Sequence, residues 1–217
     1  MKNNFSYIGY FNTPIYTLHI PEWVKDLNKA SDKFILEAKK RDKKIIKDTE
    51  KKLKQKVGDL NFVYHSNTLI NQKGFEEFQK FIMKTSLKIL DHMGYNMSER
   101  KLFLSEFWVQ EFSKKGGGSH EKHLHYNCHM SGFYFLKSSD KTSFPIFHDP
   151  RHGKNMTHFL EKNMDEVTFA SEQIHYKPIP GNLILFPSYL EHSFSKDFGV
   201  EPFRFIHFNI QVLPYNV

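Results

Sequence analysis

Hydrophobic and polar positions follow two different patterns along the chain, and the change comes near residue 100. In the first part, apolar residues recur at the spacing of a helix face. Pro21 suits the first turn of a helix, and charged residues with an incomplete apolar stripe run from Ser31 to Lys56. A second helix with one buried face is predicted over Phe75–Met93. Residues 1–100 are therefore expected to form a mostly helical support region.

After residue 100 the pattern changes to short β-like runs separated by Gly, Pro, Ser and Asp. Several short strands at close spacing are typical of a β-sandwich or barrel. No internal repeat or Pro/Ser-rich linker divides the sequence, so residues 1–217 are expected to form one domain, with the β core in 101–217. The predicted strands are Phe103–Phe112, Met130–Lys137, Phe144–His148, Glu172–Lys177, Asn182–Phe186 and Phe203–Val212.

Composition supports a folded protein. Aromatic residues make up 16% of the chain, and 22 of them are phenylalanine, which is enough for a large apolar core. The single cysteine, Cys128, allows no disulfide within the chain, which fits a reducing compartment. The first residues lack the apolar run of a signal peptide, and no stretch is apolar enough for a membrane span. A cytoplasmic protein with no membrane partner is therefore expected.

The net charge of +7 raises the question of an acidic partner such as nucleic acid. Basic residues gather in the segment Lys39–Lys56, which holds ten of them against three acidic ones. Only one of the ten is arginine, and no aromatic residue is present to stack on bases. We interpret the segment as an exposed helix whose Ile45, Ile46 and Leu53 pack against the barrel. Nucleic acid is therefore not the expected partner.

The candidate chemistry lies in the β half, which holds ten of the 13 histidines between His120 and His207. His123-Leu124-His125 is the sharpest signal, because residues i and i+2 of an extended strand point to the same side. Two imidazoles at this spacing can bind one metal ion. His192 follows a buried strand that ends at Pro187, at the position where a barrel mouth carries functional groups. We expect these three histidines to be the metal ligands.

Arg204 is the fourth candidate residue. It shares one face of the last strand with Ile206, Phe208 and Ile210, and this apolar face is expected to point into the barrel. An arginine there needs a carboxylate partner, which is either a protein Asp or Glu or a bound dicarboxylate.

These segments resemble, in the same order, a family of 2-oxoglutarate–Fe(II) oxygenases found in marine bacteria and their phages. The barrel half is distantly similar to prolyl 4-hydroxylases. The resemblance extends over nearly the whole chain, and the combination of segments is more specific than any one of them. The segments are FNTPIY from Phe11, SNTL from Ser66, His123-Leu124-His125 with SGFYFL from Ser131, FHDPR from Phe147, FPSYLEH from Phe186, and Arg204 with Phe208-Asn209-Ile210.

The resemblance implies a mainly β protein with N-terminal helices, in which the core is a double-stranded β-helix, a jelly-roll or cupin-like barrel. It implies His123 and His192 as iron ligands and Arg204 as the anchor for the distal carboxylate of 2-oxoglutarate. The wider superfamily has an acidic residue where His125 stands, so His125 or a carboxylate such as Asp149 completes the site. Many relatives carry a serine where Ile206 stands, and Tyr134 is the candidate for the missing hydroxyl.

The expected function is that of a dioxygenase that uses Fe(II), 2-oxoglutarate and O2 to hydroxylate a substrate the sequence does not identify. A peptidyl side chain, a small metabolite and a modified base all fit. Two alternatives stay open at this point. One is a cupin-type metal enzyme without 2-oxoglutarate, which leaves Arg204 unexplained, and the other is a non-enzymatic binding module. The oligomeric state is not predicted.

Overall fold

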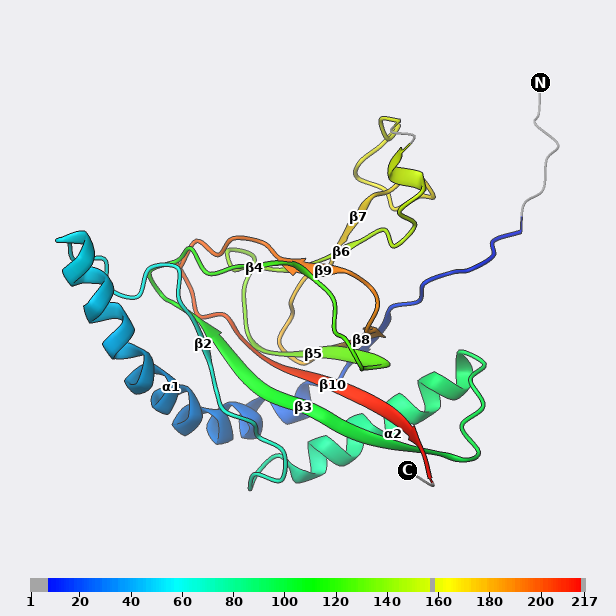
Figure 1. Cartoon of the computed structure of the whole chain (residues 1–217), viewed down its shortest axis with the longest axis horizontal. Coiled ribbons are helices and arrows are strands. Elements are labelled where there is room, and N and C mark those ends of the chain that lie inside the picture. The colour runs from blue at the N-terminus through cyan, green and yellow to red at the C-terminus, as the bar shows by residue number, and fades with distance from the viewer. Residues whose placement is uncertain (1–7, 157–158, 216–217) are drawn as a thin grey trace.

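A computed structural model describes residues 8–156 and 159–215, and its described part is built around two antiparallel β-sheets that face each other (Figure 1). The arrangement agrees with the predicted jelly-roll barrel. The larger sheet has six strands in the order β1 (Tyr16–His19), β8 (Asn182–Pro187), β5 (Met130–Lys137), β10 (Arg204–Pro214), β3 (Arg100–Phe112) and β2 (Val63–His65). The smaller sheet has four, in the order β4 (His120–His123), β9 (His192–Phe194), β6 (Pro145–His148) and β7 (Gln173–His175).

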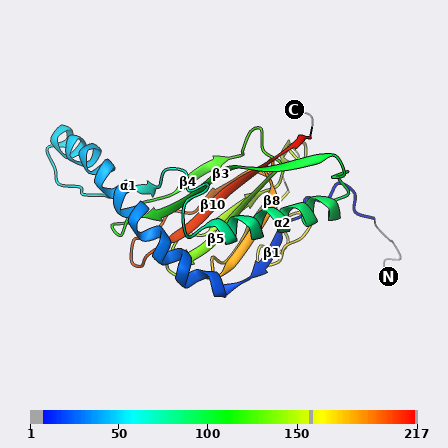
Figure 2. The same ribbon diagram turned by 90° about the horizontal axis from the view of Figure 1, so that it is seen from below.

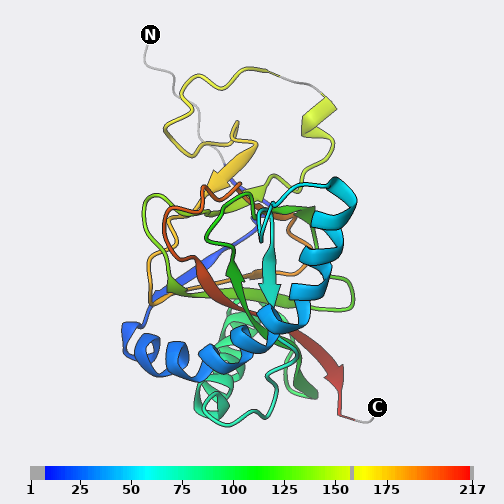
Figure 3. The same ribbon diagram turned by 90° about the vertical axis from the view of Figure 1, so that its left-hand side faces the viewer.

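Two helices cover the outer face of the larger sheet. A short 3-10 helix, η1 (Pro21–Trp23), leads into α1 (Val24–Leu53), and α2 is Glu76–His92; a second 3-10 helix, η2, is Lys154–Met156. Figure 2 shows α1 and α2 crossing this face, and Figure 3 shows α2 and the start of α1 below the sheets. Their apolar faces and the outward side chains of the strands form one core, which includes Leu27, Ile35, Phe78, Ile82, Phe107, Val109, Tyr134, Ile206 and Phe208.

The space between the two sheets is filled mostly by phenylalanine. Alternate residues of each strand of the larger sheet point to this inner core, as the period of a strand requires. The larger sheet is therefore buried on both faces, and its central strands are apolar without alternation. The inner core consists of Phe112, Phe133, Phe135, Phe147, Ile184, Phe186, Leu190, Phe194, Phe203 and Phe205.

The six predicted strands correspond to β3, β5, β6, β7, β8 and β10. The sequence did not predict β1 and β2, which come from the first 100 residues and form the two edges of the larger sheet. Nor did it predict β4 and β9, which carry His123 and His192. These four strands have only three or four residues each, too few to show a clear period of two.

The basic segment is helical as predicted, but its packing differs. Ile45 and Leu53 are 55% and 60% exposed, so the prediction that these two residues pack against the barrel is wrong, whereas Ile46 is partly buried. The reason is length: α1 has 30 residues, and its last turns project beyond the sheet that its first turns cover (Figure 1). Among the described residues, no helix is long and apolar enough to cross a membrane.

Candidate metal centre

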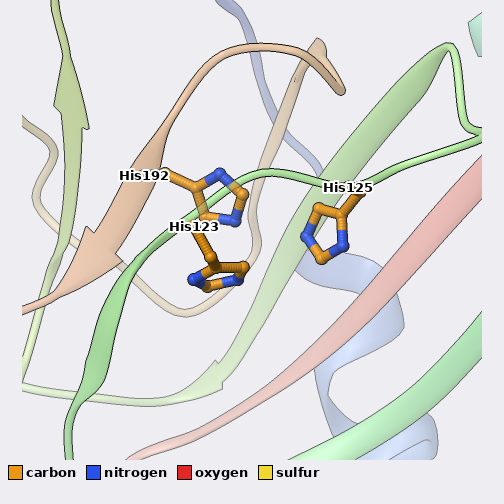
Figure 4. Close-up of side chains that lie close together, drawn as sticks. All are labelled: His123, His125 and His192. Carbon is orange, nitrogen blue, oxygen red and sulfur yellow. The ribbon is translucent and has the colours of Figure 1, made fainter.

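Three predicted ligands, His123, His125 and His192, come together between the sheets. His123 of β4 lies directly opposite His192 of β9, and their ring centroids are 4.4 Å apart. His125 lies two residues after the end of β4, and its backbone N–H donates to the carbonyl of Ser188 (3.1 Å). One nitrogen of each ring lies within 4.8 Å of the other two, and Figure 4 shows the rings around a common space.

Backbone carbonyls fix the orientation of two of these rings. Nδ1 of His123 donates to the carbonyl of Glu121 (2.7 Å), and Nδ1 of His192 donates to that of Leu190 (3.0 Å). A carbonyl can only accept, so each ring carries its proton on Nδ1 and keeps a lone pair on Nε2. A second hydrogen bond of this kind is typical of metal-binding histidines. Nε2 of His192 and Nε2 of His125 are buried without a protein partner in the described structure.

Burial keeps the imidazoles of His125 and His192 neutral. Burial lowers the pKa of His192 to about 3, and the neighbouring histidines add to the effect. Burial, together with His123, lowers the pKa of His125 to about 4. Neutral imidazole is the form that binds a metal ion, so at pH 7 neither ring must lose a proton first.

The histidines open into a cavity of about 190 Å³. None of its described lining residues is Asp, Glu, Lys or Arg, although Glu106 offers a carboxylate oxygen within 4.8 Å of a ring nitrogen of His125. Three neutral imidazoles with open positions beside them suit Fe(II). The lining consists of His65, Trp108, Gln110, His120, His123, His125, Phe133, His192, Phe194, Phe205 and His207.

His207 and Trp108 are part of this cavity, and sequence reasoning did not single them out. They lie opposite each other in the β10–β3 ladder, with ring centroids 4.7 Å apart. Nε2 of His207 and the indole Nε1 of Trp108 are buried and have no partner among the described residues. The available signal was alternation: His207 is three residues from Arg204 and therefore lies on the other face of the strand.

Arg204 does not lie with the histidines. Its Nη1 is 2.6 Å from Asp32 Oδ1 of α1, and its Nη2 is 2.6 Å from Glu111 Oε2 of β3. The prediction that Arg204 points into the barrel is therefore wrong, because it lies on the face of the sheet that the helices cover. Its partners are protein carboxylates, the other possibility that the sequence left open.

Tyr134 lies on the same helix-covered face. Its hydroxyl donates to the carbonyl of Ile20 (2.7 Å), and its ring is 4.7 Å from that of Phe78 in α2. Burial raises the pKa of this hydroxyl, so it stays protonated. The larger sheet therefore lies between the side chain of Tyr134 and the histidine cavity.

Asp149, the alternative carboxylate, is engaged elsewhere. Its Oδ2 is 2.7 Å from Arg151 Nη2 and 3.1 Å from Lys154 Nζ, and these partners outweigh burial to hold its pKa at about 2. It lines a different cavity, of about 570 Å³, between the N-terminal segment and the loops around β6 and β7. The three-histidine cluster therefore forms without it.

Comparison with known sequences identifies the domain that carries the histidines. Residues 106–209 match the family described as "Putative 2OG-Fe(II) oxygenase". This part of the chain is a 2OG-Fe(II) oxygenase domain. It spans β3 to β10 and contains all three histidines of the cluster. No curated protein sequence shows significant similarity to the chain.

Several solved structures share the fold of this chain at low sequence identity. The chain is similar to AviO1 from Streptomyces viridochromogenes Tue57, with a TM-score of 0.58, 9% identity and coverage of 92% of this chain and 90% of that one. A Trichoplax adhaerens prolyl hydroxylase, in complex with a fragment of hypoxia inducible factor, has a TM-score of 0.52 and 8% identity. The match covers 90% of this chain and 82% of that one. A Pseudomonas putida prolyl-4-hydroxylase has a TM-score of 0.50 and 12% identity, with coverage of 92% of this chain and 93% of that one. These similarities confirm the predicted double-stranded β-helix.

Proposed function

We propose that this 2OG-Fe(II) oxygenase holds its iron on His123, His125 and His192 and hydroxylates a substrate that binds over the histidine cavity. The observation that carries the proposal is the convergence of the three rings, one nitrogen of each within 4.8 Å of the others. Fe(II) and 2-oxoglutarate supply the oxidising chemistry with O2 when they are bound. The chain contributes orientation, neutral ligands and exclusion of water.

Charge supports 2-oxoglutarate as the ligand of this cavity. Three imidazole ligands add no negative charge to Fe(II), and Glu106, the carboxylate beside His125, supplies at most one. A dianion such as 2-oxoglutarate neutralises the ion, which makes its binding favourable where water is excluded.

The distal carboxylate of 2-oxoglutarate needs a donor, and the best-placed candidate is Trp108 rather than Arg204. The indole N–H of Trp108 is buried in the cavity wall without a partner in the described structure. A buried donor left unpaired costs free energy, so a carboxylate that accepts from it is stabilised. Arg204 already pairs with Glu111 and Asp32 on the other face of the sheet.

The test is Fe(II) binding and succinate formation. Purified protein should bind one Fe(II) anaerobically and form succinate from 2-oxoglutarate only with iron and O2. His123→Ala, His125→Ala and His192→Ala should each weaken iron binding and abolish succinate formation. His152→Ala is the matched control, because His152 is exposed on the loop after β6. Iron binding without succinate would favour the cupin-type alternative, and no iron binding would favour a binding module.

The substrate class is a separate question for the same assay. Peptides containing proline, small metabolites and modified bases should be compared for their ability to stimulate succinate formation. A peptidyl side chain is the first class to try, since two similar structures are prolyl hydroxylases. Mass spectrometry of a stimulating substrate should show a gain of one oxygen atom.

A further inference from the structure

A carboxylate lies beside the histidine cluster and has no part in the function proposed above. Glu106 of β3 points to the same interior as His125 and His207. These three residues each offer one ligand atom, and the three atoms lie within 4.8 Å of one another. His125 belongs to this group and to the three-histidine group, so the two groups are adjacent.

The carboxylate of Glu106 is held in place by a chain of buried polar side chains. Asn209, opposite Glu106 in the β3–β10 ladder, donates from Nδ2 to Glu106 Oε2. Asn209 Oδ1 accepts from Ser131 Oγ (2.6 Å), and Ser131 Oγ is 2.8 Å from Ser188 Oγ. Asn209, Ser131 and Ser188 are fully buried. Hydrogen bonds of this kind orient carboxylates that bind metal ions.

His207 supplies an independent indication of a ligand. The residue is 2% exposed, and its Nε2 has no hydrogen-bond partner in the described structure. Its ring centroid is 4.7 Å from that of His125. A buried ring nitrogen without a partner is unfavourable, and an ion between Glu106, His125 and His207 would satisfy it.

We propose that Glu106, His125 and His207 form a second metal position and that a single ion occupies either this position or the three-histidine one. Two ions bound at once would have to share His125 as a ligand. They would therefore lie close together, and the repulsion between two dications in the protein interior opposes double occupancy. The second set has two imidazoles and a carboxylate, which suits Fe(II), Mn(II) or Co(II). The proposal shares His125 with the proposed function and does not involve 2-oxoglutarate.

Cobalt binding tests the proposal without any activity measurement. Apo protein is titrated with Co(II), and affinity and visible spectrum are recorded for wild type, His192→Ala, Glu106→Gln and the double variant. His192→Ala removes one ligand of the first position and leaves the second intact. It should still bind one Co(II), with a changed spectrum. Adding Glu106→Gln to it should weaken binding by about tenfold or more.

Glu106→Gln alone should change the affinity much less, because the ion then uses the three histidines. Gln retains an oxygen that can accept from Asn209, so the fold is preserved. Asp149→Asn is the matched control, since it neutralises a carboxylate outside both groups. His123→Ala replaces His192→Ala if the latter does not fold.

An equal effect of Glu106→Gln in both backgrounds would overturn the second position. A stoichiometry of two in wild type would overturn single occupancy. Failure of the three-histidine site gives a different result: His123→Ala and His192→Ala would bind Co(II) as wild type does.

Discussion

Arg204 of β10 lies directly opposite Glu111 of β3, and its Nη2 is 2.6 Å from Glu111 Oε2. Both side chains are buried, at 5% and 6% exposure, and Lys39 of α1 reaches the other carboxylate oxygen. Burial alone raises the pKa of Glu111, but the two cations outweigh it and keep the pKa below its usual range. Lys39 and Asp32 of α1 both bind this pair, which fastens α1 to the sheet.

Replacing Arg204 should destabilise the protein more than it weakens cosubstrate binding. In Arg204→Leu, Glu111 loses its buried partner, and the free energy of unfolding should fall by about 3 kcal/mol. Urea unfolding measures this loss, and calorimetry measures the affinity for 2-oxoglutarate. Arg204→Lys, which keeps the charge, should lose less stability. Normal stability with no 2-oxoglutarate binding in Arg204→Leu would restore this residue as the anchor.

Trp108→Phe should weaken 2-oxoglutarate binding while iron binding is retained. The substitution removes the indole N–H and keeps an aromatic ring against His207. A hydrogen bond to a charged group contributes about 1.5–3 kcal/mol, so the affinity should fall by about tenfold to a hundredfold. Anaerobic titration of the Fe(II) protein gives the dissociation constant. An unchanged constant would show that the distal carboxylate binds elsewhere.

The apo protein should lose stability as the pH falls below about 6.5. The pKa values of His192, His125 and His207 are lowered by burial, so the unfolded chain binds more protons than the folded one between the folded values and 6.5. Each such histidine contributes a slope of about 1.4 kcal/mol per pH unit. Urea unfolding between pH 5 and 8 avoids most carboxylate titration. His192→Gln should reduce the slope of unfolding free energy against pH below 6.5 by the contribution of one histidine, about 1.4 kcal/mol per pH unit. An identical slope would show that the pKa of His192 is not lowered in the folded protein.

Gly132→Ala should disrupt the central sheet. A Cβ on Gly132 would lie 2.3 Å from Cζ of the buried Phe208 and 2.7 Å from the carbonyl oxygen of Ile184. Overpacking of this kind costs about 1–3 kcal/mol, measurable by thermal unfolding. Gly153→Ala is the control, because a Cβ there meets nothing within 4 Å. Equal melting temperatures for the two variants would show that Phe208 moves aside freely.

The basic end of α1 should not bind nucleic acid specifically. Lys43, Lys44 and Lys47 are exposed, yet the segment lacks aromatic residues and has acidic ones interspersed. Binding to single- and double-stranded nucleic acid at about 150 mM salt should be no tighter than micromolar, the range of non-specific association. Tighter binding that is lost when the three lysines are neutralised would point to a nucleic-acid substrate.

The barrel and the three histidines could be predicted because their signals are local. His123 and His125 are two residues apart, and His192 follows a strand whose start and end are marked by Gly181 and Pro187. The direction of Arg204 could not be predicted in the same way. Its strand is apolar on both faces, since helices cover one side and the second sheet covers the other. Apolarity alone cannot then distinguish inside from outside.

Glu106 and His207 were missed for a different reason. Their proximity depends on the pairing of β3 with β10, which joins strands about a hundred residues apart in the chain. A bulge shifts the register of that pairing between Asn209 and Ile210. Counting residues along either strand therefore does not show which residue of β3 lies opposite which residue of β10.

β4 is an edge strand of the smaller sheet, only four residues long, and its pairing with β9 is irregular between His120 and His123. Short edge strands are among the first segments to open in native proteins. An ion shared by His123 and His192 would act as a crosslink between β4 and β9. Loss of the ion should then appear as faster amide hydrogen exchange and proteolytic nicking at β4, well before the helix-backed sheet unfolds.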